Sequence, residues 1–596
     1  MKLAAGLMIV RIGFLCFLAS AAWLAAAPAA ETVPDPATLP VVELPKFVVT
    51  DTRELPPPES WRYTRIAGLE VLSTVSETNT RRFVRDFQRL QEVIEIVWPA
   101  VTRGPPPVPG MLILCGGGNA FDTFMPARLR PAGHDAAGND RGAGALAKAA
   151  GPAGAAARPT SIFLQESDRA AIVVDFVKDR FDDRAIPNAS PLANVPLSAE
   201  PAEDGPTPGS SFLTENDPFR EFYLQYFRSV IRRGGSEAPP WLEEGLVQVL
   251  ASVQFSKEEI ALGRLQDGAG GQRPDEFTVR LNRQPLMDLN RMFAAEPPAG
   301  GDVLTYSPQC YAFVHLCLYG KKGTYQPALQ KLVRRAAAEP VTEKVFQECF
   351  GLSYDQMGVL LRSHITHGAH QYIQLRAAKG ATLLAEPPVF TVRAATPAEI
   401  GRIKGETYRM GGHNDRARLA LIAPYVRGEH DLALVAALGL HARATGDTER
   451  ARKFLEAAAQ AKVQRARVYL ELARLRLAAA KTAAPKSSSV DDATVARIMP
   501  LLMLGVRIAP PMPEIFELIA EVRAQSVTPP TPAEITLVYE GAQRFPRRLR
   551  LIYLAAALAV RQGDRTEART LIAHGLSLAG KNEPAQHFKA LESQLQ

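Results

Sequence analysis

Residues 217–250 read DPFREFYLQYFRSVIRRGGSEAPPWLEEGLVQVL, and this stretch decides how the first half of the chain folds. Apolar side chains recur there at the spacing of one helix face: Phe219, Phe222, Tyr223, Tyr226, Phe227 and Val230. Asn216 or Asp217 can cap that helix, and Pro218 suits its first position. A second helix should begin at Pro239-Pro240-Trp241. The stretch therefore predicts two consecutive helices.

The segments around this stretch predict an α+β fold. Short β-branched or apolar runs indicate strands at 63–73, 111–114, 161–164 and 170–176, and residues 79–97 have amphipathic helical spacing. Another helix is predicted at 307–318. Two low-complexity segments, about 130–160 and 185–211, are rich in Ala, Gly, Pro or Asn and are interpreted as long loops.

The N-terminus has the organisation of a secretory signal peptide. Lys2 and Arg11 are basic, residues 12–24 form an unbroken apolar run, and Ala27-Pro28-Ala29 offers small side chains for cleavage. We therefore expect residues 1–30 to direct export, and the product to be periplasmic or extracellular. The alternative is an uncleaved membrane anchor, although the run is shorter than the ~20 residues that a span needs. No other segment is apolar enough to span a bilayer, and the Pro-rich residues 31–60 predict an extended lead-in.

Charge and cysteine content exclude several classes of protein. A net charge of +7 on 596 residues, without a Lys/Arg block interleaved with aromatics, does not predict nucleic-acid binding. Cys115, Cys310, Cys317 and Cys349 are too few for a disulfide scaffold. Cys310 and Cys317 lie seven residues apart on a predicted helix, so their Cα atoms would be ~10 Å apart, too far for a disulfide. Pairing of either with Cys349 stays open, and buried free thiols are the preferred interpretation.

The last third of the chain contains an internal repeat. Gly412, Gly446 and Gly563 are each followed five residues later by Ala and then Arg (Ala417-Arg418, Ala451-Arg452 and Ala568-Arg569), and the first two glycines are 34 residues apart. Paired amphipathic helices flank them: 432–444 with 449–461, and 551–561 with 566–578. A polar linker at 484–492 interrupts the pattern.

A 34-residue period, a tight turn and a small residue at the helix crossing resemble the tetratricopeptide repeat (TPR). The resemblance covers roughly 399–596, although the aromatic consensus positions are poorly filled. It implies an all-α superhelical array that binds a protein or peptide partner on its concave face. An unrelated helical bundle is the alternative.

The stretch 217–250 resembles the core of gluzincin peptidases, especially the peptidase MA-like group. In that family two His of HExxH bind Zn²⁺ from one helix, the intervening Glu activates water, and a Glu on the next helix is the third ligand. Residues 241–245, WLEEG, match the second element and place Glu244 at the ligand position. The resemblance covers roughly 61–375 and implies an N-terminal zincin-like domain, joined to the array by a linker at 376–398. A chance match of WLEEG on a capped helix is the alternative.

The metal-binding histidines of that family are missing. With Gln225 at the second His position, Glu221 replaces the first His and Phe222 replaces the catalytic Glu. Shifting the register by one puts Arg220 and Leu224 at the His positions and keeps Glu221 as the Glu. No HExxH occurs anywhere in the chain, and a Gln amide is a poor zinc ligand, so zinc is possible but not expected.

These four positions, Glu221, Phe222, Gln225 and Glu244, are therefore interpreted as vestigial. Phe222 is expected in the core because it falls on the apolar stripe. Glu221, Gln225 and Arg228 should share a polar face, on which Arg228 can pair with Glu221. The sequence thus predicts the helical frame of a peptidase without its metal.

Other candidate sites carry weaker signals. The pattern His364-x-x-His367-x-x-His370 spreads its rings around a helix, so structural or solvated histidines are expected. Residues 115–119, CGGGN, lack the Lys-Ser/Thr of a P-loop and predict a turn at the end of a strand. His315, in the helix that resembles the one behind a zincin site, is expected to be a satisfied core group.

Together these patterns favour an exported, non-catalytic scaffold or binding protein in the cell envelope, with a pseudo-peptidase domain and a TPR-like array. The alternative is an active metal-dependent hydrolase that uses Glu244, Glu221 or Glu243 with non-standard ligands. A purely structural envelope role is a third hypothesis. The first needs neither cofactor nor metal.

Overall fold

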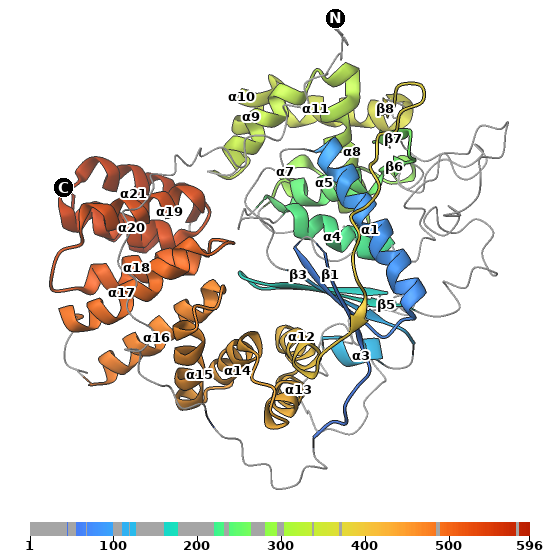
Figure 1. Cartoon of the computed structure of the whole chain (residues 1–596). Coiled ribbons are helices and arrows are strands. Elements are labelled where there is room, and N and C mark those ends of the chain that lie inside the picture. The colour runs from blue at the N-terminus through green and yellow to red at the C-terminus, as the bar shows by residue number, and fades with distance from the viewer. Residues whose placement is uncertain are drawn as a thin grey trace, which may run out of the picture.

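A computed structural model describes the chain at residues 45, 55–66, 68–98, 110–117, 120–126, 160–176, 220–231, 238–263, 281–294, 303–336, 339–368, 372–483, 489–579 and 583–595. A mixed sheet with surrounding helices forms the N-terminal part, and an all-helical array follows it (Figure 1). The predicted signal peptide, both low-complexity loops and the cap at 216–218 lie outside the described residues.

The N-terminal part alternates strands and helices as the sequence predicts. Its strands are β1 (Arg62–Ile66), β2 (Leu69–Ser73), β3 (Gly110–Cys115), β4 (Ser161–Gln165), β5 (Ala170–Asp175), β6 (Gln254–Phe255), β7 (Glu259–Leu262), β8 (Ile373–Arg376) and β9 (Arg393–Ala394). Its helices are α1 (Glu77–Val97), α3 (Ala120–Phe124), α4 (Arg220–Ile231), α5 (Pro240–Ala251), α7 (Leu289–Met292), α8 (Val303–Tyr319), η9 (Gly320–Gly323), α9 (Gln326–Ala336), α10 (Glu343–Phe350), α11 (Tyr354–Ser363) and η10 (His364–Gly368).

The described strands form two sheets. The larger has the order β4-β5-β3-β2-β1-β9, and the smaller has the order β6-β7-β8. In the larger sheet β2, β3 and β5 are parallel, while β1, β4 and β9 run antiparallel to their neighbours. The predicted linker at 376–398 therefore contributes the edge strand β9 to this sheet.

Both faces of the larger sheet are buried, which explains why β3 (GMLILC) is apolar throughout. On one face, side chains such as Val71 and Leu112 pack with α1 and α4. On the other, side chains such as Leu72 and Ile113 pack against α3 and against Ile403 of α12 (Pro397–Met410), the first helix of the array. The sheet thus lies between the N-terminal helices and the start of the array (Figure 1).

The array continues with pairs of antiparallel helices. After α12 come α13 (Asn414–Val426), α14 (Leu432–Ala444), α15 (Thr448–Gln460), α16 (Ala466–Ala483), α17 (Asp492–Arg507), α18 (Pro513–Gln525), α19 (Pro532–Arg544), α20 (Leu549–Gln562), α21 (Arg565–Ala579) and α22 (Glu583–Ser593). The first helix of each of the first three pairs, α12, α14 and α16, begins at Pro397, Leu432 and Ala466. These starting points are 35 and 34 residues apart. The predicted helical pairs 432–461 and 551–578 agree with α14–α15 and α20–α21 to within two residues.

The Gly–Ala pattern has the predicted structural role. Gly412, Gly446 and Gly563 have positive φ in the turns between paired helices, a conformation that glycine adopts without strain. The alanines five residues later are fully buried at the helix crossings: Ala417, Ala451 and Ala568. The repeat is therefore a repeat of helix, tight turn and close helix crossing.

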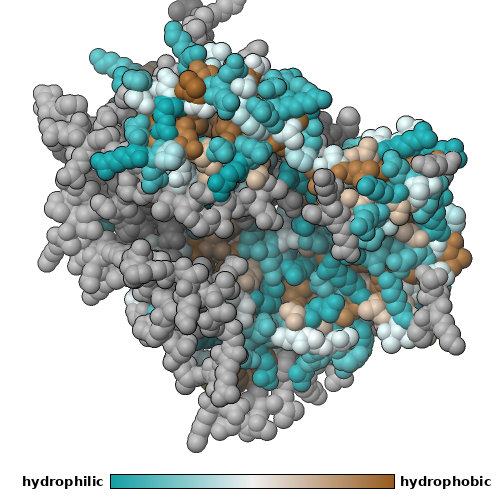
Figure 2. Space-filling model, turned by 180° about the vertical axis from the view of Figure 1, so that it is seen from behind, coloured by the Kyte–Doolittle hydropathy of each residue, from teal (hydrophilic) through white to brown (hydrophobic). Residues whose placement is uncertain are grey.

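The far end of the array returns to the N-terminal part. Arg547, in the turn before α20, donates a hydrogen bond from Nη1 to the carbonyl oxygen of Ala336 at the end of α9, at 2.5 Å. Figure 1 shows the array curving from the sheet at α12 to this second contact. Viewed from behind, its surface is mainly hydrophilic, with apolar residues in small separate groups (Figure 2).

Two expectations about the whole chain can be compared with the described residues. Cys115, Cys310 and Cys317 are buried free thiols, and Cys349 is a half-buried one. Within the described part of the chain, none of the helices combines the length and the apolar character needed to cross a bilayer.

Candidate functional site

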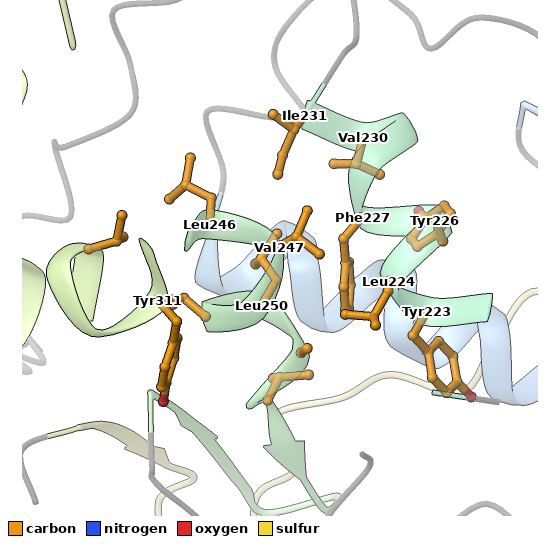
Figure 3. Packing of buried hydrophobic residues seen from close by; sticks show 14 of the residues in the cluster. Tyr223, Leu224, Tyr226, Phe227, Val230, Ile231, Leu246, Val247, Leu250 and Tyr311 are labelled. Atoms are coloured by element: carbon orange, nitrogen blue, oxygen red, sulfur yellow. The ribbon is translucent and has the colours of Figure 1, made fainter. Parts of the chain in front are cut away.

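Helices α4 and α5 pack face to face through the stripe that the sequence predicts. Figure 3 shows Phe227 of α4 on the side of the helix that faces Val247 and Leu250 of α5. Phe222, at the position of the catalytic Glu, is buried and meets Phe83 and Phe87 of α1 edge to face. Phe222 is therefore a core residue, as expected, and lies in aromatic packing where it cannot activate water.

The WLEEG segment is explained first by packing. Trp241 is fully buried and meets Phe293 and Phe313 edge to face. Gly245 allows α5 to approach α8 closely, because a Cβ there would lie 2.5 Å from Cγ2 of Val314 and 2.7 Å from the carbonyl oxygen of Cys310. Trp241 and Gly245 thus anchor α5 and fix where the carboxylate of Glu244 points.

Glu244 is the centre of a compact polar cluster formed by α4, α5 and α8. Arg228 donates from Nη2 to Oε2 of Glu244 at 2.9 Å, while the Ser307 hydroxyl and the Gln248 amide donate to Oε1 at 2.6 and 3.1 Å. Arg228 also donates from Nη1 to Oε1 of Gln225 at 3.4 Å. We call Gln225, Arg228, Glu244, Gln248 and Ser307 the Glu244 cluster.

The pairing of Arg228 differs from the expectation. Its ion pair is with Glu244 rather than with Glu221, whose side chain lies outside the described residues. One turn of α4 places Gln225 and Arg228 on the same face, and the packing of α4 against α5 brings that face to Glu244. The guanidinium therefore bridges the residues at the second-His and third-ligand positions of the resemblance.

The second register that the resemblance allows does not place metal ligands on α4 either. Leu224, at its second His position, is buried among apolar side chains. The Arg220 side chain, at the first, lies outside the described residues. Neither register therefore places a described metal-binding side chain on α4.

The Glu244 cluster does not fit a zinc ion. Gln225 offers only a neutral amide, and both oxygens of Glu244 already accept hydrogen bonds. The Arg228 guanidinium lies where a second cation would be repelled. Among the described residues, no group of three His, Cys, Asp or Glu side chains could hold a metal ion.

The electrostatics of Glu244 follow from these contacts. Burial alone would raise the pKa of its carboxyl group, but the Arg228 cation and the hydrogen bonds from Ser307 and Gln248 outweigh that effect and lower the pKa below its usual range. Glu244 is therefore ionised at neutral pH. A general acid or base near neutrality would need the opposite shift.

The histidine candidates are structural groups. His315 is buried, its Nε2 lies 2.7 Å from the carbonyl oxygen of Gly263, and its Nδ1 lies 3.0 Å from Nε2 of His364. Because a carbonyl only accepts, Nε2 of His315 carries a hydrogen, and Nε2 of His364 then donates to Nδ1 of neutral His315. His367 is exposed on η10, and His370 lies outside the described residues. The two described rings of the predicted HxxHxxH pattern thus have different environments.

The described part of the glycine-rich candidate, residues 115–117, bends the chain at the end of β3. Gly117, directly after β3, has φ of 93°, and the amide of Gly116 donates to Oγ1 of Thr74 at 2.8 Å. These two residues form the predicted strand-end turn.

A second polar cluster joins the turn between β4 and β5 to the array. Arg465, between α15 and α16, donates to Asp168 in that turn at 2.8 Å and to Glu406 of α12 at 2.7 Å. Arg409 and Arg467 both pair with Glu166 of the same turn, at 2.5 and 2.6 Å. We call these residues the hairpin–array network: Glu166, Asp168, Glu406, Arg409, Arg465 and Arg467. Figure 1 shows the turn after β4 pointing toward the array.

The hairpin–array network contains fully buried charges. Burial would raise the pKa of Asp168, but Arg465 and Arg467 lower it to about 2. Beside the network, burial would raise the pKa of the partly exposed Glu70 in β2, but Arg402 and Arg169 lower it to about 2. The paired carboxylates and guanidinium groups favour one docked position of the hairpin.

A pocket lies next to the tip of this hairpin. It has a volume of about 300 Å³ and is lined by side chains of α16, α18 and α20: Arg474, Leu477, Ala478, Lys481, Glu514, Glu517, Leu518, Glu521 and Arg550. The Ser167 hydroxyl of the hairpin donates to Oε1 of Glu514 at 2.6 Å, so the hairpin tip touches the pocket's rim. We call it the array pocket.

The sequence predicted Glu244, Gln225 and Arg228 as site residues, but it did not predict the other members of the two polar clusters. The helical spacing of Glu244 and Gln248 could have indicated their contact. Ser307 lies 63 residues beyond Glu244, and Asp168 lies 297 residues before Arg465, so no local signal connects them.

Comparisons with known proteins returned no relatives. No family model matches the chain, and neither the curated proteins nor the solved structures contain a match.

Proposed function

We propose that this chain is an exported, non-catalytic binding protein of the cell envelope. In this proposal a pseudo-peptidase domain of gluzincin-like design carries a TPR-like array, and the array binds a peptide or protein partner. The observation that carries the proposal is the Arg228 guanidinium, which bridges Gln225 and Glu244 at 3.4 and 2.9 Å, where a peptidase of this design needs a metal.

Several features support the gluzincin-like part. Two consecutive helices, α4 and α5, follow a mixed sheet, and α8 packs behind α5 at Gly245. That order matches the resemblance of residues 61–375. Because the Glu244 carboxylate is ionised and fully bonded, this domain is better suited to holding a shape than to activating water.

The TPR-like part is supported by the repeat geometry. Helices of successive pairs begin 35 and 34 residues apart at Pro397, Leu432 and Ala466. Gly439 adds a close crossing within the second pair, since a Cβ there would lie 2.9 Å from Cδ2 of Leu455. Stacked helical pairs of this kind present a continuous surface made by their first helices.

Only part of that surface is open to a partner. The hairpin–array network covers the first-helix face near Glu406 and Arg465, both almost fully buried. The array pocket, farther along at α16, α18 and α20, is open and lined by charged side chains. We therefore assign partner binding to this part of the array.

The test compares binding with cleavage. The full chain is screened against a random peptide library and, separately, incubated with a fluorogenic peptide library with and without added zinc. We expect retention of a subset of peptides and no cleavage under either condition. Cleavage that disappears in Glu244→Gln would contradict the proposal and favour a metal-dependent hydrolase.

A further inference from the structure

The floor of the array pocket is a row of carboxylates. Glu514, Glu517 and Glu521 follow one another on α18 at the spacing of one helix face. Basic side chains line the walls, with Arg474 and Lys481 on α16 and Arg550 on α20. The pocket is therefore lined by both acidic and basic side chains. Their existing contacts decide whether the pocket favours a cationic or an anionic ligand.

The three carboxylates are not neutralised equally. Glu521 has close partners, Lys481 Nζ at 3.1 Å and Arg550 Nη2 at 2.9 Å. Glu517 has Arg550 Nε only at 3.8 Å, and Glu514 has Arg548 Nη2 only at 3.9 Å. Oε2 of Glu514 is enclosed and has no hydrogen-bond partner among the described residues. Within the described part of the chain, Glu514 and Glu517 thus have no cation closer than 3.8 Å.

Burial favours a cationic guest over an anionic one. The Arg474, Lys481 and Arg550 side chains are 37, 47 and 66% exposed, so water already solvates them and an anion would add little. The Glu514 and Glu517 side chains are 23 and 14% exposed. Burial, together with the charge of Glu514, raises the pKa of Glu517, and the nearby Arg550, Arg548 and Arg474 only partly offset this effect.

The remaining walls suit the stem of a long basic side chain. Leu477 and Leu518 present apolar surface beside the carboxylates. Lys and Arg place their methylene groups along such surface while the charged end reaches polar groups. A volume of about 300 Å³ lies at the lower end for ligand pockets, which suits a side chain better than a large ligand.

We propose that the array pocket binds a Lys or Arg side chain from a peptide segment of a partner protein, with its charged end between Glu514 and Glu517. The inference rests on the proposed binding function of the array and names the chemistry of its partner. The hairpin lies at the rim through Ser167, so the bound segment also contacts the N-terminal part. The hairpin of this chain and the peptide segment of the partner would then lie side by side at the array pocket.

The test measures binding of labelled alanine-based peptides with a central Lys, Arg, Gln or Glu by fluorescence anisotropy, together with the residue frequencies among peptides selected from a random library. We expect Lys and Arg to be enriched and the Gln and Glu peptides to bind least. The double variant Glu514→Gln/Glu517→Gln should weaken the Lys peptide roughly tenfold or more, because the amides keep the shape and remove the charge.

A matched control lies on the same helical pair. Glu540 is exposed on α19, so Glu540→Gln should leave binding unchanged. Equal thermal melting of the double variant and the unaltered chain shows that the pocket still folds. If selected peptides bind without basic enrichment, or bind the double variant equally well, the cation inference is wrong while the binding function stands. If the library yields no binder, both proposals fail.

Discussion

The Glu244 cluster and the array pocket are both carboxylate sites lined by three helices. They differ in how fully hydrogen bonds and cations compensate the charge of their carboxylates. In the first, both oxygens of Glu244 accept hydrogen bonds, and an Arg from the neighbouring helix lies at 2.9 Å. In the second, Glu514 and Glu517 have their nearest cations at 3.9 and 3.8 Å. Carboxylates that are fully paired within the chain stabilise the fold. Carboxylates in a pocket that lack close cations would be stabilised by a bound cationic ligand. This difference is the reason we propose partner binding in the array.

The largest expected effect comes from the network that holds these two regions together. Arg465→Ala leaves Asp168 and Glu406 buried without their shared cation, and loss of one partner of a buried ion pair costs about 3–5 kcal/mol. We expect the free energy of unfolding, measured with denaturant, to fall by that order. Arg565→Ala, at an exposed position on α21, should change it by less than about 0.5 kcal/mol. Similar losses for both would mean that the network does not couple the regions.

Disrupting the Glu244 cluster should lower the free energy of unfolding by a smaller amount. Arg228→Ala leaves Glu244 partly buried without a cation, and we expect a loss of about 2–3 kcal/mol, because Ser307 and Gln248 still donate. Adding Glu244→Gln to Arg228→Ala removes the unpaired charge and should recover part of the loss in a double-mutant cycle. Additive losses would show that the two side chains do not interact.

The packing that aims Glu244 can be tested without touching a charge. Gly245→Ala forces a Cβ within 2.5 Å of Val314 and 2.7 Å of the Cys310 carbonyl oxygen, so α5 and α8 must separate at a cost of about 1–3 kcal/mol. Gly358→Ala is the matched control in α11, because a Cβ at that position would meet no described atom outside its own helix within 4 Å. There a helical alanine should stabilise by about 0.5–1 kcal/mol. Opposite signs in thermal unfolding are the expected result.

Acidification should draw on three buried histidines, two in the N-terminal part and one in the array. Burial and the neighbouring His364 lower the pKa of His315 to about 4, and burial lowers the pKa of His364 to about 4. In the array, His441 has its pKa lowered to about 4 by burial and nearby arginines.

The unfolded chain binds protons at these histidines near pH 6.5, before the folded chain does, so the stability they contribute above that pH is lost as the pH falls from 6.5 toward 4. The slope is at most about 1.4 kcal/mol per pH unit for each histidine. Unfolding measured between pH 6.5 and 5 should show a smaller slope in His315→Gln/His364→Gln than in His441→Gln. An equal slope in the two variants would contradict this assignment.

Local patterns in the sequence predicted most of the regular structure. The apolar residues of 79–97 and 222–231 became buried helix faces because helical periodicity alone decides which side meets the core. Gly412, Gly446 and Gly563 marked the turns correctly because only glycine adopts that backbone conformation without strain. The α+β order of the N-terminal part and the helical array were both predictable for these reasons.

The contacts that join distant segments could not be predicted in this way. Arg228 on its own helix was compatible with Glu221, and only the packing of α4 on α5 selects Glu244. The docking of Glu166 and Asp168 onto Arg409, Arg465 and Arg467 depends on a hairpin that lies hundreds of residues before the array. Such pairs follow from tertiary structure, which a single sequence does not encode as a local pattern.

The measurement that tests the central claim most directly is the zinc content of the full chain. The protein is purified without tags or chelators, and zinc is measured by elemental analysis beside the Glu244→Gln variant. If Arg228 has taken the place of the metal, both should contain less than about a tenth of an equivalent. Close to one equivalent in the unaltered chain, lost in Glu244→Gln, would contradict the account and show that Glu244 is a metal ligand.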